Sequence, residues 1–219
     1  MSKNLIRIAI DSPAAAGAGT QCKLIAKHYN LLYLDTGKIY RFIGYLYLKN
    51  KKKINYKSIG DKIKRINLKD LQKKVLLKDD VALEASMVAK DIKIRKIVNN
   101  FQLKCANSPP KKFRGSILDG RDITSVIMRD SKLKFFITAN LKTRVMRRFK
   151  ELKKINKNTN YNDVLKSIKK RDKNDYNRKI SPLKKTRDSV LINTTNLTKR
   201  ACFLKIKKII DNKIDNGNI

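Results

Sequence analysis

The stretch Leu5–Thr20, LIRIAIDSPAAAGAGT, is the part of the sequence that decides the fold. Its apolar start, LIRIAI, predicts a short buried strand. A loop of small residues, Ser12–Gly17, follows, and we expect an amphipathic helix from about Gly19 to Tyr29. A small-residue turn between a strand and a helix N-terminus points backbone N–H groups at one spot, so this stretch predicts a phosphate site.

The loop keeps only part of the usual phosphate-loop pattern, G-x-x-x-x-G-K-[ST]. Ser12 replaces the first glycine of the pattern, and Ala18 replaces its phosphate-binding lysine. Taken alone, the loop is also compatible with an ordinary strand-to-helix turn. The residues that we expect to hold nucleotide phosphates are Ser12, Pro13, Ala14, Ala15, Ala16, Gly17, Ala18, Gly19 and Thr20. The Thr20 hydroxyl is also the candidate ligand for Mg²⁺.

Further along the chain, predicted strands alternate with predicted helices. We expect strands at Leu31–Leu34, Gly115–Leu118, Lys134–Thr138 and Val190–Ile192. We expect helices at Gly37–Lys49, Leu141–Leu152, Tyr161–Arg171 and Lys199–Ile210, with helical periodicity also through Asp80–Ala106. Residues 50–78 are rich in lysine and carry weak structural signals. The alternation predicts an α/β fold with a parallel sheet, which binds ligands at the carboxyl ends of its strands.

The composition indicates a globular protein. The 219 residues are 41% hydrophobic, and no apolar run approaches the roughly 18 residues of a membrane span. The N-terminus does not resemble a secretory signal. Cys22, Cys105 and Cys202 are odd in number and far apart, which argues against a disulfide framework or a zinc site and fits a reducing cytosol.

The net charge of +36 could attract nucleic acid. The lysines, however, are spread along the whole chain and accompany many Ile and Asn residues, which share A/T-rich codons with Lys. A base bias of the genome is the simpler cause of the charge. The sequence also has no RNA-recognition aromatic motif and no zinc finger, so we do not expect nucleic acid as a partner.

Two clusters that follow predicted strands are more specific than the loop. Leu34–Arg41 reads LDTGKIYR and places Thr36 at a helix start and Arg41 one turn later, where both would face a phosphate. Asp119–Asp122 reads DGRD, again just after a strand. Arginine suits phosphate because its guanidinium fork matches the phosphate oxygens.

Two further clusters lie in predicted helical segments. Arg171–Leu183 reads RDKNDYNRKISPL, and a helix there would place Arg171, Asp175 and Arg178 on one face. An ordinary ladder of salt bridges is the alternative for this segment alone. Val81–Arg95 begins VALEASMVA and ends IR.

Taken in the order in which they occur along the chain, the four clusters resemble motifs of bacterial cytidylate kinases: L-D-[ST]-G-A-x-Y-R, V-x-x-x-A-S-x-V-A, D-G-R-D and R-D-x-x-D-x-x-R-x-x-[AS]-P-L. The resemblance runs from Ile6 to about Leu197 and is weakest at residues 50–78. It implies an α/β fold with a doubly wound, five-stranded parallel sheet of the P-loop monophosphate kinase type. Residues 1–219 would form one domain, with a helical monophosphate-binding (NMP-binding) insertion at about 37–105 and a lid at about 145–180.

The resemblance also implies the activity. The chain would transfer the γ-phosphoryl group of ATP to CMP or dCMP with Mg²⁺, as a monomer in the cytoplasm. A kinase for another monophosphate, such as UMP or AMP, and a catalytically impaired nucleotide-binding protein remain alternatives.

The family's residue roles carry over to matching positions. Those implied to read the cytosine edge are Ser86, Arg95 and Asp122. Those implied to hold the ribose are Arg171 and Asp175. Those implied to hold the acceptor phosphate are Thr36, Arg41, Arg121 and Arg178. Those implied to close over the transferring phosphoryl group are Arg144, Arg147 and Arg148.

The missing loop lysine raises a question about catalysis. Replacing a preorganised donor typically lowers the rate by about 10²–10³. Lys38 stands where the family usually has a small residue, beside Thr36 and Arg41, so we predict that it supplies the charge that Ala18 cannot. Lys38 could equally be one more solvated lysine in a lysine-rich chain.

Overall fold

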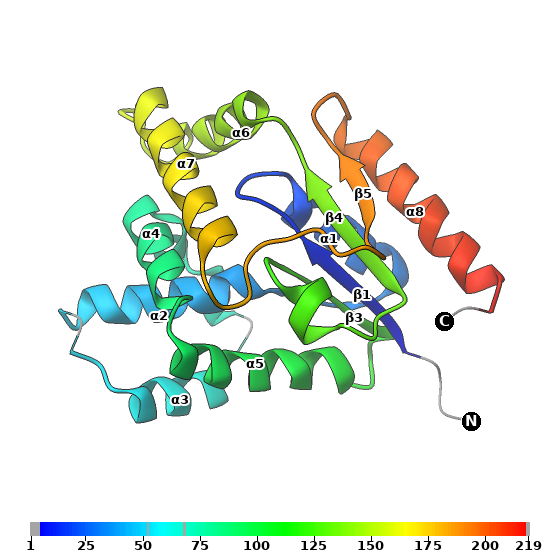
Figure 1. The fold of residues 1–219 in the computed structure, drawn as a ribbon, viewed down its shortest axis with the longest axis horizontal. Coiled ribbons are helices and arrows are strands. Elements are labelled where there is room, and N and C mark those ends of the chain that lie inside the picture. The colour runs from blue at the N-terminus through cyan, green and yellow to red at the C-terminus, as the bar shows by residue number, and fades with distance from the viewer. Residues whose placement is uncertain (1–4, 52, 68, 218–219) are drawn as a thin grey trace.

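The computed structural model describes residues 5–51, 53–67 and 69–217. At its centre lies a sheet of five parallel strands in the order β2-β3-β1-β4-β5 (Figure 1). The strands are β1 (Ile6–Asp11), β2 (Leu32–Asp35), β3 (Gly115–Gly120), β4 (Leu133–Thr138) and β5 (Val190–Asn193). The predicted α/β fold with a five-stranded parallel sheet is confirmed.

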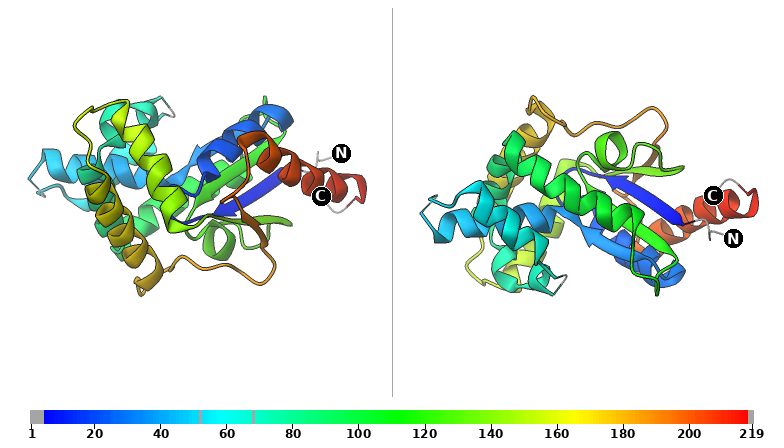
Figure 2. Two further views of the ribbon diagram at one scale, coloured as in Figure 1. Left: turned by 90° about the horizontal axis from the view of Figure 1, so that it is seen from above. Right: turned by 90° about the horizontal axis from the view of Figure 1, so that it is seen from below.

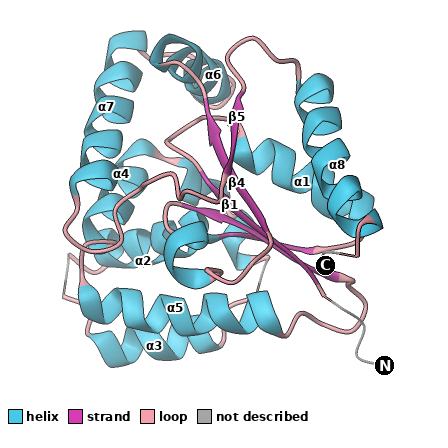
Figure 3. Ribbon diagram, turned by 45° about the vertical axis from the view of Figure 1, so that its right-hand side comes forward, coloured by secondary structure: helices cyan, strands magenta, loops and turns pink. Residues whose placement is uncertain are grey.

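Helices cover both faces of this sheet. They are α1 (Ala18–Tyr29), α2 (Thr36–Lys49), α3 (Tyr56–Lys64), α4 (Asp79–Val88), α5 (Ile92–Asn107), α6 (Leu141–Lys153), α7 (Tyr161–Asn177) and α8 (Lys199–Asp215), with short turns η1 (Asp70–Gln72), η2 (Lys74–Leu77) and η3 (Ile123–Ile127). Figure 3 shows α1 and α8 on one side of the sheet and α3 and α5 on the other. Among the described residues, no helix is both long and apolar enough to cross a membrane.

The side chains of β1 alternate between the two helical layers, as the period of a strand requires. Ile8 and Ile10 are fully buried and belong to the core that includes residues of α1 and α8. Ala9, between them, belongs to the core that includes residues of α2, α3 and α5. The residues of β1 from Ile8 to Ile10 are therefore apolar on both faces, because both faces are covered.

The structure corrects the sequence prediction between residues 50 and 106. The lysine-rich segment contains a helix, α3, whose Ile59 and Ile63 are buried. The periodic stretch Asp80–Ala106 is two helices rather than one. Asp91 ends the continuity, because its side chain accepts hydrogen bonds from the backbone N–H groups of Lys93 and Ile94 and so caps α5.

The helix predicted at Tyr161–Arg171 is also longer than expected. α7 continues to Asn177, and Arg178 has the extended conformation of a residue just beyond the helix. Arg171 and Asp175 thus share the helix, whereas the expected third position of that helical face, Arg178, lies outside it. Figure 2 shows α6 and α7 at one end of the molecule with α2 to α4, while α8 and both chain termini lie at the other end.

The carboxyl ends of the strands meet at one edge of the sheet. In the register of the strands, Asp35 lies opposite Asp119, and Asp11 lies opposite Gly120. The loop Ser12–Gly17 leaves β1 at this same edge. Polar side chains of the segments after β1, β2 and β3 are therefore brought together, which is where parallel sheets bind ligands.

Candidate active site

The loop between β1 and α1 has the backbone of a phosphate-binding turn. Ala15 and Gly17 both have positive φ, 60° and 95°. The conformation suits Gly17, whereas it costs Ala15 about 1–2 kcal/mol because the Cβ crowds the backbone. Gly17 is the N-cap of α1, and no described side chain caps this helix end. The first N–H groups of α1 therefore remain available for an anion.

Position 18 supplies no charge to this loop. Ala18 is only 3% exposed and belongs to the same apolar core as Ala16 and Cys22. A cation that assists the loop must therefore come from another element of the fold.

Two arginines of α6 and a carboxylate of α7 bind the loop backbone. Arg144 Nη1 donates to the Ala14 carbonyl at 3.0 Å, and Arg147 Nη1 donates to the Ala16 carbonyl at 3.3 Å. Asp172 accepts from the Ala14 N–H at 3.2 Å and pairs with Arg144 at 2.6 Å. The structure thus places Arg144 and Arg147 at the predicted phosphate loop. It also adds Asp172, a residue to which the sequence assigned no role.

Arg148, the third predicted arginine of α6, joins α6 to the segment before α4. Its Nη2 donates to the Leu77 carbonyl at 2.6 Å and pairs with Asp79 at 3.0 Å. Its Nη1 pairs with Glu151 at 2.9 Å. Arg148 is therefore buried between the helical insertion and α6, away from the loop carbonyls that Arg144 and Arg147 bind.

The start of α2 lies against the end of β3. The Thr36 hydroxyl donates to the Asp119 carbonyl at 2.7 Å. A Cβ on Gly120 would lie 2.5 Å from the Thr36 hydroxyl oxygen, so only glycine permits this approach. One turn later, Arg41 Nη1 donates to the Leu76 carbonyl at 2.6 Å. Thr36 and Arg41 are thus both held by the backbone of neighbouring segments.

Four arginines influence one another electrostatically: Arg41 of α2, Arg121 just after β3, Arg148 of α6 and Arg171 of α7. We call these four residues the arginine cluster. Burial and the charges of Arg41, Arg121 and Arg148 lower the pKa of Arg171 to about 9. Burial and the charge of Arg148 likewise lower the pKa of Arg41 to about 10. Asp175 pairs with Arg121 at 2.7 Å, and Arg171 Nε is buried without a hydrogen-bond partner among the described residues. Arg148 is paired with Asp79 and Glu151. The like charges that favour a bound anion are therefore those around Arg41 and Arg171.

A buried polar set lies at the end of α5 nearest to α4. Arg95 forms an ion pair with Asp122, and its guanidinium lies 5.8 Å from the centre of the Tyr40 ring. Arg178 Nη2 lies 3.6 Å from the other oxygen of Asp122. Ser86 is also buried, on α4. The structure therefore brings Arg95 and Asp122 together and adds Arg178, which the resemblance assigns to the acceptor phosphate instead. The donors and acceptors of this set suit the edge of a polar base.

The carboxylates Asp35 and Asp119 form an acidic pair that the sequence interpretation did not single out. Burial and the charge of Asp35 raise the pKa of Asp119 well above its usual range. Asp119 Oδ1 is buried without a hydrogen-bond partner among the described residues, and Oδ2 lies 3.7 Å from the position of a Cβ on Gly19. The sequence signal that could have identified this pair is its position. Asp35 is the last residue of β2, and Asp119 is the last but one of the adjacent strand β3.

Lys38 lies three residues before Arg41 on α2. Its backbone N–H donates to the Asp35 carboxylate at 3.2 Å, which caps the helix. Its side chain is half-buried and forms no hydrogen bond or ion pair with the residues that the structure describes. A cation is therefore present on the acceptor side of the site and is not committed to a carboxylate there.

Asp11, at the end of β1, should make the stability of the protein depend on pH. Its buried carboxylate accepts from the N–H groups of Ile123 and Thr124 and from the Thr124 hydroxyl. Burial, with the charge of Asp122 adding to it, nevertheless raises its pKa from 3.8 to about 6. Because the folded pKa is the higher one, its contribution to stability is complete below pH 3.8 and is lost as pH rises through 6.

We expect the free energy of unfolding to fall by about 2 kcal/mol more in the wild type than in Asp11→Asn between pH 4.5 and 7.5. Urea denaturation across this range measures the difference. Asp61→Asn, the same change at an exposed position, should keep the wild-type slope. Parallel profiles for the wild type and Asp11→Asn would contradict the assignment.

Comparison with known proteins identifies the family of this chain. Residues 8–212 match the family model described as "Cytidylate kinase". A protein of Clostridium tetani named "Cytidylate kinase" is 36% identical and covers 95% of each chain. A protein of the same name from Mesorhizobium japonicum is 34% identical and covers 98% of each chain.

A similar fold occurs in a crystal structure of an uncharacterized protein from Eubacterium ventriosum. The TM-score is 0.54 at 21% sequence identity, with 93% of this chain and 97% of the other covered. This similarity supports the fold alone. The family model and the curated relatives cover nearly the whole chain, and the chain therefore belongs to the cytidylate kinase family.

Proposed function

We propose that this ATP-dependent nucleoside monophosphate kinase transfers the γ-phosphoryl group of ATP to CMP or dCMP. The observation that carries the proposal is the arginine cluster, in which burial and the charges of neighbouring arginines lower the pKa of Arg41 and Arg171. A phosphate bound between these side chains would offset that repulsion. Thr36, Arg41, Arg121 and Arg178 would hold the acceptor phosphate.

Recognition of the base is assigned to the buried set beside the arginine cluster. Ser86, Arg95 and Asp122 would read the cytosine edge, since cytosine offers both an amino donor and ring acceptors. Arg171 and Asp175, on one helix, would hold the ribose. The ion pair between Arg95 and Asp122 supports this assignment, because it orients both groups before the base arrives.

The phosphate donor is assigned to the loop Ser12–Thr20. The N–H groups at the start of α1 would bind ATP phosphates. Thr20 and Asp119 fit Mg²⁺, because the buried Oδ1 of Asp119 has no described partner beside the loop and Mg²⁺ prefers oxygen ligands. When bound, the ion would supply positive charge that neutralises the phosphates.

The two helical regions at one end of the molecule would enclose the acceptor and the donor. We assign residues 37–105 to the monophosphate-binding insertion and residues 145–180 to a lid, within one domain. Arg144 and Arg147 on the loop side and Arg148 on the insertion side support this, since the three side chains of α6 reach both regions. Closing such a lid aligns the reactants and excludes water.

The chemical step needs positioning and charge stabilisation more than covalent help. Arg144, Arg147, Arg148 and Lys38 would supply positive charge to the transferring group. Lys38 is the replacement for the lysine that Ala18 lacks, and its uncommitted side chain beside Arg41 supports that role. We also place the protein in the cytoplasm as a monomer.

A coupled assay of ADP release across CMP, dCMP, UMP, AMP and GMP tests the acceptor assignment. We expect CMP and dCMP to exceed the other acceptors by at least about tenfold in kcat/KM, because buried polar groups left unpaired by a wrong base are costly. The alternatives UMP and AMP are not favoured by the family assignment. Faster turnover of UMP or AMP, or CMP binding without any turnover, would overturn the proposal.

A further inference from the structure

A groove separates the second half of α2 from α3, outside the proposed active site. One part of it has a volume of about 390 Å³ and the adjoining part about 540 Å³. Asn55, Ser58 and Lys62 line both parts, so the two form one continuous feature. Its combined size falls within the range of pockets that hold small organic ligands, roughly 300–1,000 Å³.

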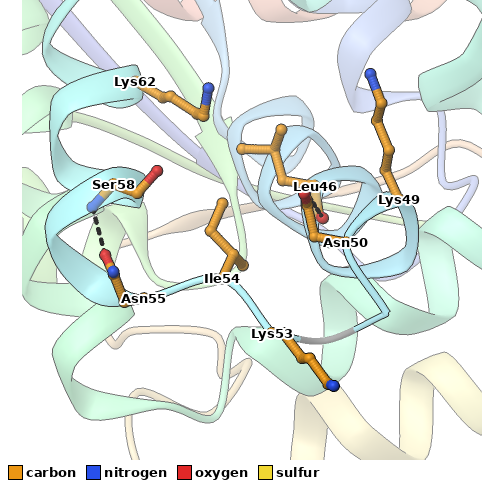
Figure 4. Close-up of a pocket in the computed structure, with 8 residues that line it drawn as sticks. All are labelled: Leu46, Lys49, Asn50, Lys53, Ile54, Asn55, Ser58 and Lys62. Carbon is orange, nitrogen blue, oxygen red and sulfur yellow. Dashed lines mark hydrogen bonds between the residues drawn. The ribbon is translucent and has the colours of Figure 1, made fainter.

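Apolar side chains form part of the floor of the groove. Leu46 and Ile54 line one part, and Phe42 and Ile66 line the other. Figure 4 shows Leu46, Ile54 and Lys62 projecting into the space between the two helices. A flat apolar group of a ligand would find contact area here.

The rim of the groove is strongly basic. The cationic lining residues are Lys49, Lys53, Lys57, Lys62, Arg65 and Lys73. The acidic lining residues are Asp61 and Asp70, and Asp70 is already paired with Lys73 at 3.0 Å. The net positive charge of the described lining residues selects for an anionic ligand.

We propose that this groove is a second binding site for a nucleoside polyphosphate, distinct from the proposed active site. The apolar floor takes the base and the basic rim takes the phosphates. An extended RNA strand fits the groove less well, because such strands need aromatic platforms for successive bases and Phe42 is the one aromatic residue among the described lining residues.

The position of the groove allows a bound ligand to influence the acceptor site through α2. Phe42, Leu46 and Lys49 lie on α2, which carries Thr36 and Arg41 at its start. A ligand in the groove therefore contacts the helix that holds the proposed acceptor-phosphate residues. Coupling between two sites through one rigid helix is reciprocal in free energy.

Equilibrium dialysis of the full chain with the β,γ-imido analogue of ATP and Mg²⁺ tests the proposal. We expect two analogues per wild-type chain. The variant Lys49→Glu/Lys62→Glu should bind one analogue, or bind the second at least about tenfold more weakly, because two charge-assisted contacts are reversed. The matched control Lys205→Glu/Lys208→Glu changes the net charge equally on exposed positions of α8 and should still bind two.

Three results would overturn the proposal. The first is that the wild type binds only one analogue. The second is that both double variants lose the second analogue equally, which would show a general charge effect. A twelve-residue uridine strand that binds the wild type more tightly than the analogue and loses affinity in Lys49→Glu/Lys62→Glu would identify a nucleic-acid surface instead. If thermal melting shows that Lys49→Glu/Lys62→Glu does not fold, the variant Lys49→Ala/Lys62→Ala is used in its place.

The test is independent of the assignment of the acceptor. The number of analogues bound per chain does not depend on which monophosphate the enzyme phosphorylates. Failure of the acceptor panel with two analogues still bound would therefore leave the groove intact.

Discussion

Replacing Arg171 by methionine should lower kcat/KM for CMP by roughly 10²–10³ and at the same time raise the free energy of unfolding. Arg171 is half-buried beside Arg41, Arg121 and Arg148, and burial and these charges lower its pKa to about 9. Holding the side chain charged therefore costs stability at neutral pH. Methionine keeps the apolar stem and removes the repulsion, but it also removes a guanidinium that would bind the nucleotide.

The opposite signs of the two effects make this variant informative. Steady-state kinetics with CMP and thermal or urea denaturation of the free protein measure them. Arg200→Met, an exposed position on α8, should change neither quantity appreciably. If Arg171→Met loses activity and stability together, Arg171 has a structural role and the arginine cluster is not an anion site.

The second large effect is expected at Lys38. Lys38→Ala should lower kcat by about 10²–10³ with a small change in KM for CMP, because a cation used mainly in the transition state acts on kcat. The side chain lies on α2 beside Arg41 and has no ion-pair partner among the described residues, whereas position 18 is buried alanine.

A pair of reciprocal variants separates relocation of the charge from simple loss. Ala18→Lys alone should gain less than about tenfold in kcat, whereas Ala18→Lys combined with Lys38→Ala should recover most of the activity that Lys38→Ala loses. Lys27→Ala, an exposed lysine of α1, is the control. Near-wild-type turnover of Lys38→Ala would show that Lys38 is only a solvated lysine.

Local patterns predicted the strands well because each strand is short and mainly apolar, and the central strands β1, β3 and β4 are mostly buried. The same patterns failed where side chains, rather than periodicity, set the boundary. Asp91 divides the stretch Asp80–Ala106 by capping a new helix, and Arg178 leaves the helical conformation at the end of α7. A short length and a low apolar content hid α3, whose two buried isoleucines stand among lysines.

The motif residues were identified from the sequence, but their partners were not. Neither the Asp172 contact with Ala14 nor the proximity of Asp119 to Gly19 follows from spacing along the chain, because each pair is separated by at least a hundred residues. Such pairs are set by strand order and by how α7 packs on the loop. The same holds for the arginine cluster, whose members come from four separate segments.

By itself, the sequence determined the alternating α/β fold, the small-residue loop after β1 and the order of the motif clusters that place the chain in its family. These depend on local apolar patterns and residue types, which the chain carries without any tertiary contact. Only the tertiary structure decided which charges meet. It left position 18 buried and neutral, and it brought Arg41, Arg121, Arg148 and Arg171 close enough to influence one another. Electrostatic energy depends on distances through space rather than along the chain.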